Sequence, residues 1–200
     1  MAKLWQCQRQ DQGVSENPKS PTSAPEHIQF CAQCAAPMVT KSRAGKPRRV
    51  CEVCGYIHFI EAKVAVGGLV VENGKVLLVR RAKPPERGKW CLPAGYLDYG
   101  EEPRAAAARE VLEETHLEID VSDVSDVYFN PVDDPSQPGA SLLVLYQATV
   151  VGGTLQADDD ASDAAFFPLD NLPELAFAST REAIARLIDV QDDATSLDSG

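Results

Sequence analysis

The segment from Gly95 to Leu117, GYLDYGEEPRAAAAREVLEETHL, decides how this chain folds. From Pro103 onward it consists mostly of strong helix formers, with a proline in the first turn, where its missing N–H does no harm. Glu101 and Glu102 come just before, at the positive end of the helix dipole, where negative charge is favoured. The sequence therefore predicts a helix that begins near Glu102.

Three glutamates lie close together on this expected helix. Glu110 precedes Glu113 by three residues and Glu114 by four, so their side chains share one face, about 5–6 Å apart at Cβ. Like charges at this spacing repel unless a cation lies between them. Oxygen ligands favour Mg²⁺ or Mn²⁺, which keep several waters and recruit substrate phosphates. Residues 108–114 alone would be typical of a solvated surface helix, but the surrounding pattern favours a metal site.

The spacing across the whole segment is specific. Six residues follow the pattern G-x5-E-x7-R-E-U-x-E-E-x-G-U, where U is a large aliphatic residue: Gly95, Glu101, Arg109, Glu110, Glu113 and Glu114. This is the Nudix box, and the chain resembles a Nudix hydrolase. One position departs from the box, because His116 replaces a glycine that normally ends the helix in a left-handed conformation, which histidine adopts less easily.

The resemblance implies roles for the box residues. Glu110 and Glu114 are expected to be the main ligands of a catalytic Mg²⁺ or Mn²⁺. Glu113 would be a third ligand or would polarise the attacking water, and Glu101 would complete the acidic rim. Arg109 is expected to hold a glutamate side chain in place rather than to contact the substrate.

Further site residues are expected outside the helix. A turn at Gly95 should bring a backbone carbonyl to the metal, and glycine permits this close approach. The catalytic base, if it lies outside the box, is expected at Asp163 or Asp160 in the segment ADDDASDAAFF, although a solvated acidic loop is the alternative. Arg80 and Arg81, which precede the box, are the expected substrate-binding bases.

The cysteines indicate a second metal site. Four of them form two C-x2-C pairs separated by residues 35–50: Cys31, Cys34, Cys51 and Cys54. This spacing predicts a structural Zn²⁺ in a four-cysteine ribbon, because a module this small cannot stabilise itself by core burial. Two disulfides are the alternative. Cys91 follows Trp90 in an apolar run and is expected to be a buried, inert thiol, whereas Cys7 lies in the N-terminal tail.

The composition divides the chain into four parts: a disordered tail (1–27), a zinc ribbon (28–60), a Nudix domain (61–190) and an acidic tail (191–200). Residues 41–49, KSRAGKPRR, contain five basic residues and are expected to form a solvated loop or a patch facing an anionic partner.

Hydrophobic patterns predict the elements around the box. Strands are expected at 64–71, 75–80, 119–129 and 141–151, a short strand near 166, and an amphipathic helix at 179–189 capped by Ser179 or Thr180. Asn73-Gly74 predicts a hairpin between the first two strands. The fold class is α+β, and the resemblance implies an α/β/α sandwich with a mixed sheet.

The net charge of −11 argues against a large polyanionic partner such as nucleic acid. The chain has no apolar run long enough to span a membrane and no signal-peptide pattern, so we expect a soluble cytoplasmic protein, with an organelle as the other compartment left open. A homodimer is also expected.

Several segments resemble one branch of the family. VCEVCGYIHF, RGKWCLPAGYLDYGEE and LPELAFAS are similar to the zinc-ribbon-bearing Nudix proteins that include the plant FAD and ADP-ribose pyrophosphatases. The resemblance implies metal-dependent hydrolysis of a diphosphate bridge in ADP-ribose or FAD, with AMP as one product.

Two other functions are weighed against this one. An NADH pyrophosphatase is the first, although only Ser136-Gln137-Pro138 of the motif that is typical of that branch is present. A non-catalytic module that binds a nucleotide, or RNA through the basic residues of 41–49, is the second.

Overall fold

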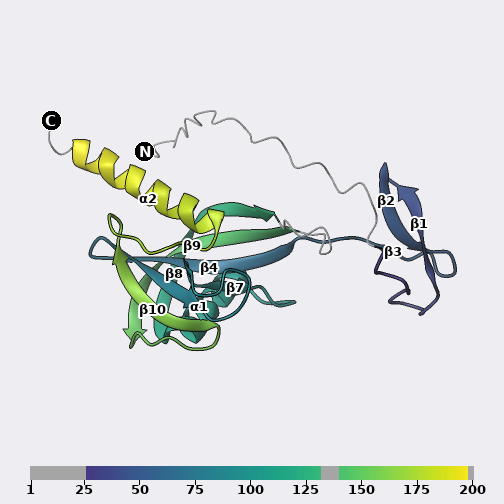
Figure 1. Ribbon diagram of the computed structural model, residues 1–200, viewed down its shortest axis with the longest axis horizontal. Coiled ribbons are helices and arrows are strands. Elements are labelled where there is room, and N and C mark those ends of the chain that lie inside the picture. Colours follow the sequence, from purple (N-terminus) through teal and green to yellow (C-terminus); the bar gives the residue numbers. More distant parts are fainter. Residues whose placement is uncertain (1–25, 132–139, 198–200) are drawn as a thin grey trace, which may run out of the picture. The chain divides into compact units, whose positions relative to one another are not determined.

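The computed structural model describes residues 26–131 and 140–197. It contains two compact units, an N-terminal unit (Met1–Ile60) and a C-terminal unit (Glu61–Gly200). Both are shown in Figure 1. The predicted N-terminal tail, including Cys7, and most of the loop at 131–140 lie outside the described residues.

The N-terminal unit is a small antiparallel sheet. Its strands are β1 (Met38–Arg43), β2 (Lys46–Cys51) and β3 (Ile57–His58), in the order β1-β2-β3. Ala44 and Gly45 join β1 to β2 with φ values of 50° and 75°, the left-handed conformation of a tight two-residue hairpin turn. The basic run 41–49 is therefore a hairpin and not a loop. The sequence did not predict these strands, because their polar residues lack the alternation of apolar and polar residues by which a strand is recognised.

The core of the N-terminal unit is very small. Cys31, Met38 and Cys51 are its buried members, and Ile28, Ala36 and Tyr56 pack against them. Arg49 adds a network of hydrogen bonds, in which its Nε donates to the Ile28 carbonyl over 2.8 Å. A core of this size cannot by itself offset the entropy of folding.

The C-terminal unit is built on a seven-stranded mixed sheet (Figure 1). Five strands lie in the order β10-β5-β4-β9-β8, while β6 pairs with β5 and β7 with β4. Their bounds are β4 (Lys63–Glu72), β5 (Lys75–Arg81), β6 (Trp90–Cys91), β7 (Ala94–Tyr96), β8 (Leu117–Pro131), β9 (Ala140–Gly153) and β10 (Ala161–Pro168). Strands β4 and β9 are parallel, whereas β4–β5, β5–β10 and β8–β9 are antiparallel.

Two helices cover opposite faces of this sheet. Along β5, Leu78 packs in a cluster with Ile184 of α2 (Ala178–Leu197), whereas Leu77 packs in another with Val111 of α1 (Pro103–Thr115). Because successive residues of a strand point to opposite faces, α1 and α2 lie on the two sides. The predicted α/β/α sandwich with a mixed sheet is confirmed.

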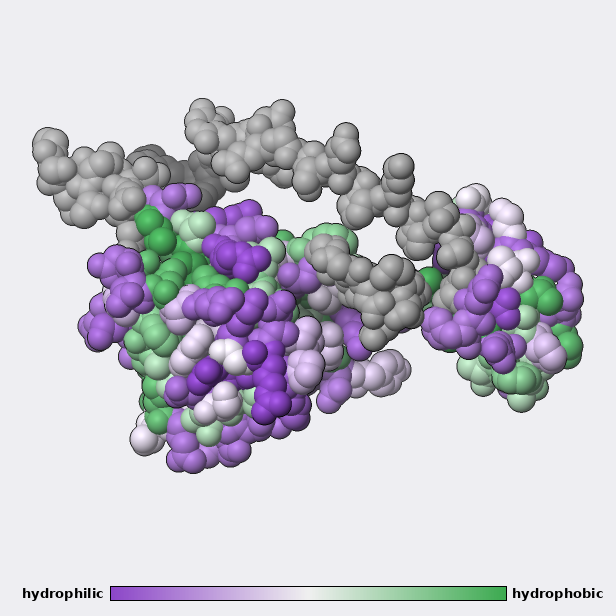
Figure 2. Space-filling view, viewed as in Figure 1, coloured by the Kyte–Doolittle hydropathy of each residue, from purple (hydrophilic) through white to green (hydrophobic). Residues whose placement is uncertain are grey.

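The apolar residues are mostly internal. In Figure 2 the visible face of the C-terminal unit is largely hydrophilic, and the apolar residues that it shows gather beside α2. No helix among the described residues has the length and apolar character needed to cross a lipid bilayer.

The hairpin predicted at Asn73-Gly74 is present. These residues have φ values of 50° and 73°, and Val71 and Glu72 pair with Val76 and Lys75 on either side of the turn. Asparagine and glycine adopt this conformation at little cost, which is why the dipeptide is a strong hairpin signal.

Two elements extend well beyond the residues predicted for them. Helix α2 begins at Ala178, because the Phe177 carbonyl accepts the first helical N–H, so Ser179 and Thr180 lie buried in the first turn and do not cap it. The helix continues to Leu197 into the predicted acidic tail, since neither glycine nor proline interrupts it. Strand β10 begins at Ala161, not near 166, because its polar start pairs with β5.

Candidate active site and metal centre

Helix α1 begins as predicted, at a cap that the sequence supplies. The Glu102 carboxylate accepts the backbone N–H groups of Arg104 and Ala105 at 2.9 and 3.0 Å. It thereby satisfies two of the N–H groups that a helix start leaves unpaired. This rigid start fixes the rotation of the helix and hence the face on which its glutamates lie.

The helix ends at His116 in the left-handed conformation that the family pattern assigns to glycine. His116 has φ 56° and ψ 16°, and its N–H donates to the Leu112 carbonyl over 2.8 Å. Its ring is also hydrogen-bonded to Asp158 Oδ2 at 2.9 Å. A left-handed non-glycine residue is disfavoured by about 1–2 kcal/mol, and the contact with Asp158 offsets part of this cost.

Two carboxylates of α1 are buried. Glu110 and Glu114 are only 9% and 7% exposed. Loss of solvent raises the pKa of Glu114 to about 8, although the N–H of Ala94, which donates to it over 3.0 Å, acts in the opposite direction. Burial also raises the pKa of Glu110, against the lowering effect of Arg109. Two buried carboxylates one helical turn apart, such as Glu110 and Glu114, require a cation between them or a proton on one of them.

Arg109 organises the acidic side chains around it. Its guanidinium donates to Glu110 Oε1 at 2.8 Å, to Glu113 Oε2 at 2.9 Å and to both oxygens of Glu101 at 2.8 and 2.9 Å. Arg109 holds the pKa of Glu101 below its usual range. These bonds gather three glutamates around Arg109, and its role in positioning them for catalysis stays a prediction.

Gly95 lies in β7, directly against Glu110. A Cβ atom added at Gly95 would overlap the Glu110 carboxylate. The absence of a side chain therefore lets the backbone of β7 approach the buried acid. Gly95 lies in a strand and not in the expected turn, and the approach of its carbonyl to a metal stays a prediction.

The helix face opens into a cleft of about 1150 Å³. Of the residues expected to form the site, the structure brings seven to its wall: Arg81, Gly95, Arg109, Glu110, Glu113, Glu114 and Asp160. A cleft of this size exceeds the usual volume of drug-sized ligand sites, so it accommodates a dinucleotide.

Three expected site residues do not line the cleft. Glu101 lies behind Arg109, which occupies both of its carboxylate oxygens. Arg80 donates instead to the Gly88 carbonyl at 2.8 Å. Asp163 lies on β10 opposite Arg80, exposed and outside the cleft, because the strand begins earlier than expected.

Asp159 and Asp160 take the place expected for Asp163 and line the cleft. Asp160 forms an ion pair with Lys83, and its carbonyl accepts the N–H of Ala82 at 2.8 Å, which ties loop 82–89 to this wall. The sequence singled out Asp160 as an alternative but missed Asp159. The run of three aspartates at 158–160 was the signal in the sequence for an acidic group at this site. The sequence does not show the turn geometry that decides which of the three lines the cleft.

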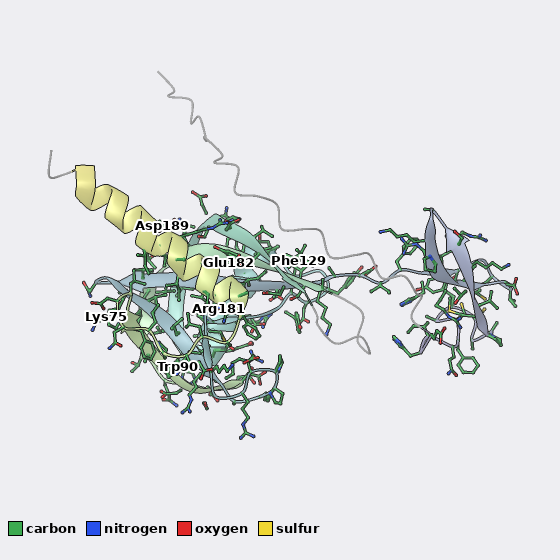
Figure 3. All side chains as sticks on the ribbon, turned by 45° about the horizontal axis from the view of Figure 1, so that its top comes forward. Lys75, Trp90, Phe129, Arg181, Glu182 and Asp189 are labelled. Carbon is green, nitrogen blue, oxygen red and sulfur yellow. The ribbon has the colours of Figure 1, made fainter. Side chains whose placement is uncertain are left out.

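The first turn of α2 supplies another wall of the cleft that the sequence did not indicate. Phe177 to Arg181 line it, and Figure 3 shows Arg181 at the start of this helix. The Arg81 guanidinium lies 5.0 Å from the centre of the Phe177 ring, and its Nε donates to the Pro85 carbonyl at 2.7 Å. Arg81 and Phe177 therefore form a cationic and aromatic surface in the cleft.

Cys91 lines the same cleft but is chemically inert. Burial raises the pKa of its thiol to about 12, so the thiolate form is negligible at neutral pH. The structure agrees with the expectation of a buried, unreactive thiol.

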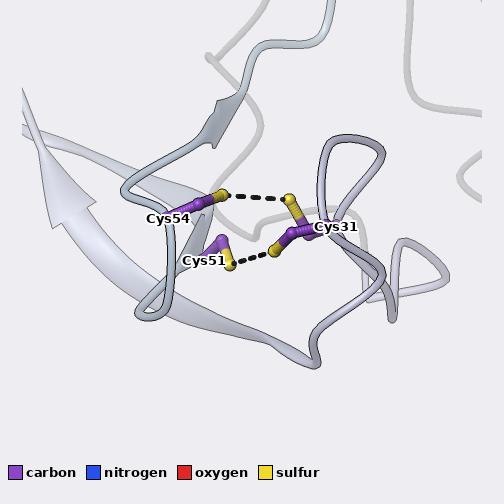
Figure 4. Close-up of side chains that lie close together, drawn as sticks. Cys31, Cys51 and Cys54 are labelled. Carbon is purple, nitrogen blue, oxygen red and sulfur yellow. Dashed lines mark hydrogen bonds between the residues drawn. The ribbon is translucent and has the colours of Figure 1, made fainter.

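The N-terminal unit gathers its four cysteines into one cluster (Figure 4). All four sulfur atoms lie within 4.8 Å of one another, and the Cys31–Cys54 and Cys34–Cys51 pairs are 3.5 Å apart. Tetrahedral zinc with bonds of about 2.3 Å requires sulfur separations of about 3.8 Å, whereas a disulfide requires about 2.05 Å. The cysteines are free, so their arrangement fits Zn²⁺ and not the two-disulfide alternative.

The two C-x2-C segments repeat one backbone design. In each, the first cysteine's N–H donates to the carbonyl five residues later and its carbonyl accepts the N–H four residues later: Cys31 with Ala36 and Ala35, and Cys51 with Tyr56 and Gly55. Ala35 and Gly55, the equivalent residues, both have positive φ, at 59° and 81°. Both segments therefore hold their two cysteines in the same backbone turn.

Comparison with known proteins agrees with this geometry. The family model for the Nudix domain matches residues 61–187. An ADP-ribose pyrophosphatase of Methanocaldococcus jannaschii is 39% identical over 122 residues, 61% of this chain and 71% of that protein. The NAD-capped RNA hydrolase NudC of Stutzerimonas stutzeri is 30% identical over 164 residues, 80% of this chain but only 54% of that protein.

A solved structure is also similar. The Nudix hydrolase from Nitrosomonas europaea superposes with a TM-score of 0.69 at 29% identity, covering 80% of this chain and 90% of that one. The family match spans more than half of the chain. It includes helix α1, which has the acidic face that the family pattern specifies. This chain therefore belongs to the Nudix hydrolase family.

Proposed function

We propose that the protein hydrolyses the diphosphate bridge of a nucleoside diphosphate linked to another moiety, with ADP-ribose or FAD as substrate and AMP as one product. The observation that carries this proposal is the pair of buried carboxylates, Glu110 and Glu114, on the wall of a cleft large enough for a dinucleotide. The name of the Methanocaldococcus jannaschii relative supports ADP-ribose. The expected relationship to the plant FAD and ADP-ribose pyrophosphatases remains part of the proposal.

The residues present fit Mg²⁺ or Mn²⁺. Glu110, Glu113 and Glu114 supply carboxylate oxygens, and the backbone at Gly95 lies directly against Glu110. When bound, the metal neutralises charge on the phosphoryl oxygens and activates water. Glu101 would join these ligands only by giving up its two hydrogen bonds to Arg109. We therefore propose that Glu101 acts through Arg109.

The remaining wall of the cleft suits the rest of the substrate. Arg81 lies close enough to the buried acids that its charge lowers the pKa of Glu114, and Arg109 is already bound to glutamates, so we assign Arg81 to the phosphoryl groups. We no longer assign this role to Arg80, because its Nε donates to the Gly88 carbonyl of loop 82–89. The Phe177 ring offers its face to a planar base or flavin. The proton-accepting role expected of Asp163 passes to Asp160 or Asp159, which line the cleft.

A second candidate is hydrolysis of an NADH-type substrate, which includes NAD-capped RNA. The residues from Glu61 to Gly200 number 140, fewer than the 164 that match NudC, so that match reaches into the N-terminal unit. A relative named NAD(P)H pyrophosphatase, from Mus musculus, also covers 72% of this chain. Ser136 to Pro138, the partial motif of this branch, lie outside the described residues.

A substrate panel tests the proposal. The full chain is incubated with ADP-ribose, FAD, NADH, diadenosine polyphosphates and deoxynucleoside triphosphates, with and without Mg²⁺ or Mn²⁺, and phosphate is measured after the products are treated with phosphatase. We expect ADP-ribose or FAD to have a kcat/KM well above that of any triphosphate, and only with metal. Preference for NADH would select the second candidate. Phosphate release from none of them would indicate the binding module, and preference for triphosphates would reject the substrate class. The homodimer and the cytoplasmic location remain predictions.

A further inference from the structure

The basic residues of the N-terminal hairpin share one face. In the register of β1 and β2, Lys41 is opposite Arg48 and Arg43 is opposite Lys46. Cross-strand partners point to the same side, and alternate residues of a strand do so as well. All four bases therefore project from one face, whereas Arg49 belongs to the other and hydrogen-bonds within the unit.

This arrangement is unfavourable for the isolated hairpin. Like charges directly opposite each other on neighbouring strands repel. Of the four bases, Lys41 has an ion-pair partner within residues 26–60, Glu52, and the described part of that segment shows none for the other three. The buried Nε of Arg48 has no hydrogen-bond partner among the described residues. The hairpin therefore concentrates positive charge of which, within the described residues 26–60, only that of Lys41 is neutralised by an ion pair.

An exposed aromatic ring lies at the same face. Phe59 directly follows β3, in which Ile57 pairs with Val50, and the alternation places Val50 and Arg48 on one side. The Phe59 side chain is 53% exposed, and the Arg48 guanidinium lies 4.5 Å from its ring centre. Basic groups that follow a backbone, combined with an aromatic surface for stacking, are the combination that binds single strands.

We propose that this face, formed by Lys41, Arg43, Lys46, Arg48 and Phe59, binds single-stranded nucleic acid. The bases would contact phosphates, and Phe59 would stack on an unpaired base. The negative net charge of the chain comes from residues 61–200, whereas residues 27–60 contain five Lys and Arg but one Glu. The proposal goes beyond the hydrolytic function and does not depend on it.

Fluorescence anisotropy with a labelled 12-nucleotide single strand, as RNA and as DNA, tests the proposal on the zinc-loaded full chain. Each phosphate contact contributes about −0.7 to the salt slope of a single strand, so three or four contacts predict an affinity about 20- to 50-fold weaker at 200 mM than at 50 mM salt. Inorganic polyphosphate, which carries charge without bases, is the competitor that separates nucleic acid from any polyanion.

A matched pair of substitutions locates the site. Lys46 and Lys75 each directly follow a two-residue hairpin turn, Ala44-Gly45 and Asn73-Gly74, with nearly the same φ values. Lys75 belongs to the sheet of the C-terminal unit, and Figure 3 shows it at the opposite end of that sheet from Phe129. We expect Lys46→Glu to weaken binding by about fivefold or more, whereas Lys75→Glu, with the same change of charge, leaves it unchanged. Phe59→Ala should weaken binding of the oligonucleotides, by about fivefold or more, but not of polyphosphate.

Two further measurements keep the outcomes distinct. Zinc content of about one per chain in Lys46→Glu and Phe59→Ala shows that the N-terminal unit remains folded. Unchanged hydrolysis of the panel substrates by both variants separates this proposal from the hydrolytic one. The proposal is overturned if no strand binds at 50 mM salt, if Lys46→Glu and Lys75→Glu act equally, or if polyphosphate binds as tightly and Phe59→Ala has no effect.

Discussion

The two units of this protein both bring potential metal-ligand groups close together, but the hydrophobic cores that hold these groups in place differ greatly in size. Four cysteine sulfurs in the N-terminal unit rest on a core in which two of the three buried members are cysteines themselves. Glu110 and Glu114 project from helix α1, which packs on the large sheet through two buried clusters. Val111 of the helix packs in a cluster with Val70, and Ala106 and Ala107 pack in a cluster with Val66. We infer that metal would maintain the fold of the first unit and serve only the chemistry of the second.

The units also differ in charge. Residues 27–60 contain five Lys and Arg and one Glu, whereas residues 61–200 contain 11 Lys and Arg and 26 Asp and Glu. The net charge of −11 is thus the sum of a basic segment and a strongly acidic one. A partner that the whole-chain charge would repel can therefore bind the basic unit alone.

The largest expected effect is loss of zinc from the N-terminal unit. Cys51→Ser removes one of four ligands, and because zinc binding supplies about 10–16 kcal/mol in modules of this kind, we expect residues 28–60 to unfold. Elemental analysis should find about one zinc in the parent chain and none in the variant, with panel hydrolysis retained. Cys91→Ser, in the other unit, is the control and should keep its zinc. Zinc retained in Cys51→Ser would contradict the assigned ligands.

The second expected effect is on catalysis. Glu114→Gln should lower kcat by about two to four orders of magnitude, because it removes a charge that acts mainly in the transition state. Thermal unfolding should show no loss of stability, since the amide is less costly to bury than a carboxylate. Glu118→Gln changes an exposed glutamate four residues later and should leave kcat unchanged. Full activity of Glu114→Gln at saturating Mg²⁺ would remove Glu114 from the site.

A smaller effect follows from the raised pKa of Glu114. A buried acid whose pKa rises from 4.5 to about 8 binds its proton more tightly in the folded state, so its contribution to stability is complete below pH 4.5 and is lost as the pH rises to about 8. Without Mg²⁺, the melting temperature of the C-terminal unit should therefore fall across this range in the parent relative to Glu114→Gln. Mg²⁺ should bind more tightly at pH 8 than at pH 6, because it displaces the proton. Parallel pH profiles for the two proteins would contradict the assignment.

The smallest effect tests the repeat within the N-terminal unit. Ala35 has the left-handed conformation that glycine provides at the equivalent Gly55. Ala35→Gly should relieve about 1 kcal/mol of strain, which corresponds to about fivefold tighter zinc binding in competition with a chelator. Ala36→Gly, at a residue without positive φ, is the control and should not tighten binding. Equal effects of the two substitutions would show that the strain at Ala35 is not relieved by glycine.

Local chemistry was predictable wherever one short segment specifies it. The start of α1 at Glu102 and the turn at Asn73-Gly74 each depend on residues a few positions apart, and the grouping of the four cysteines depends on two such C-x2-C pairs; all were expected from the sequence. The hairpin of β1 and β2 was not expected, because its strands are held by pairing and by the cysteine cluster and lack an apolar pattern of their own.

The sequence by itself determined the family, the two clusters of candidate metal ligands and the alternation that places helices on both faces of a sheet, because spacing along a helix, strand or turn fixes which side chains meet locally. Only the tertiary structure decided which acids and bases reach the cleft. Asp160 and Arg81 line it, whereas Asp163 and Arg80 do not, since the register between β5 and β10 fixes where each residue lies. That register depends on packing between segments about 80 residues apart, which no local pattern records.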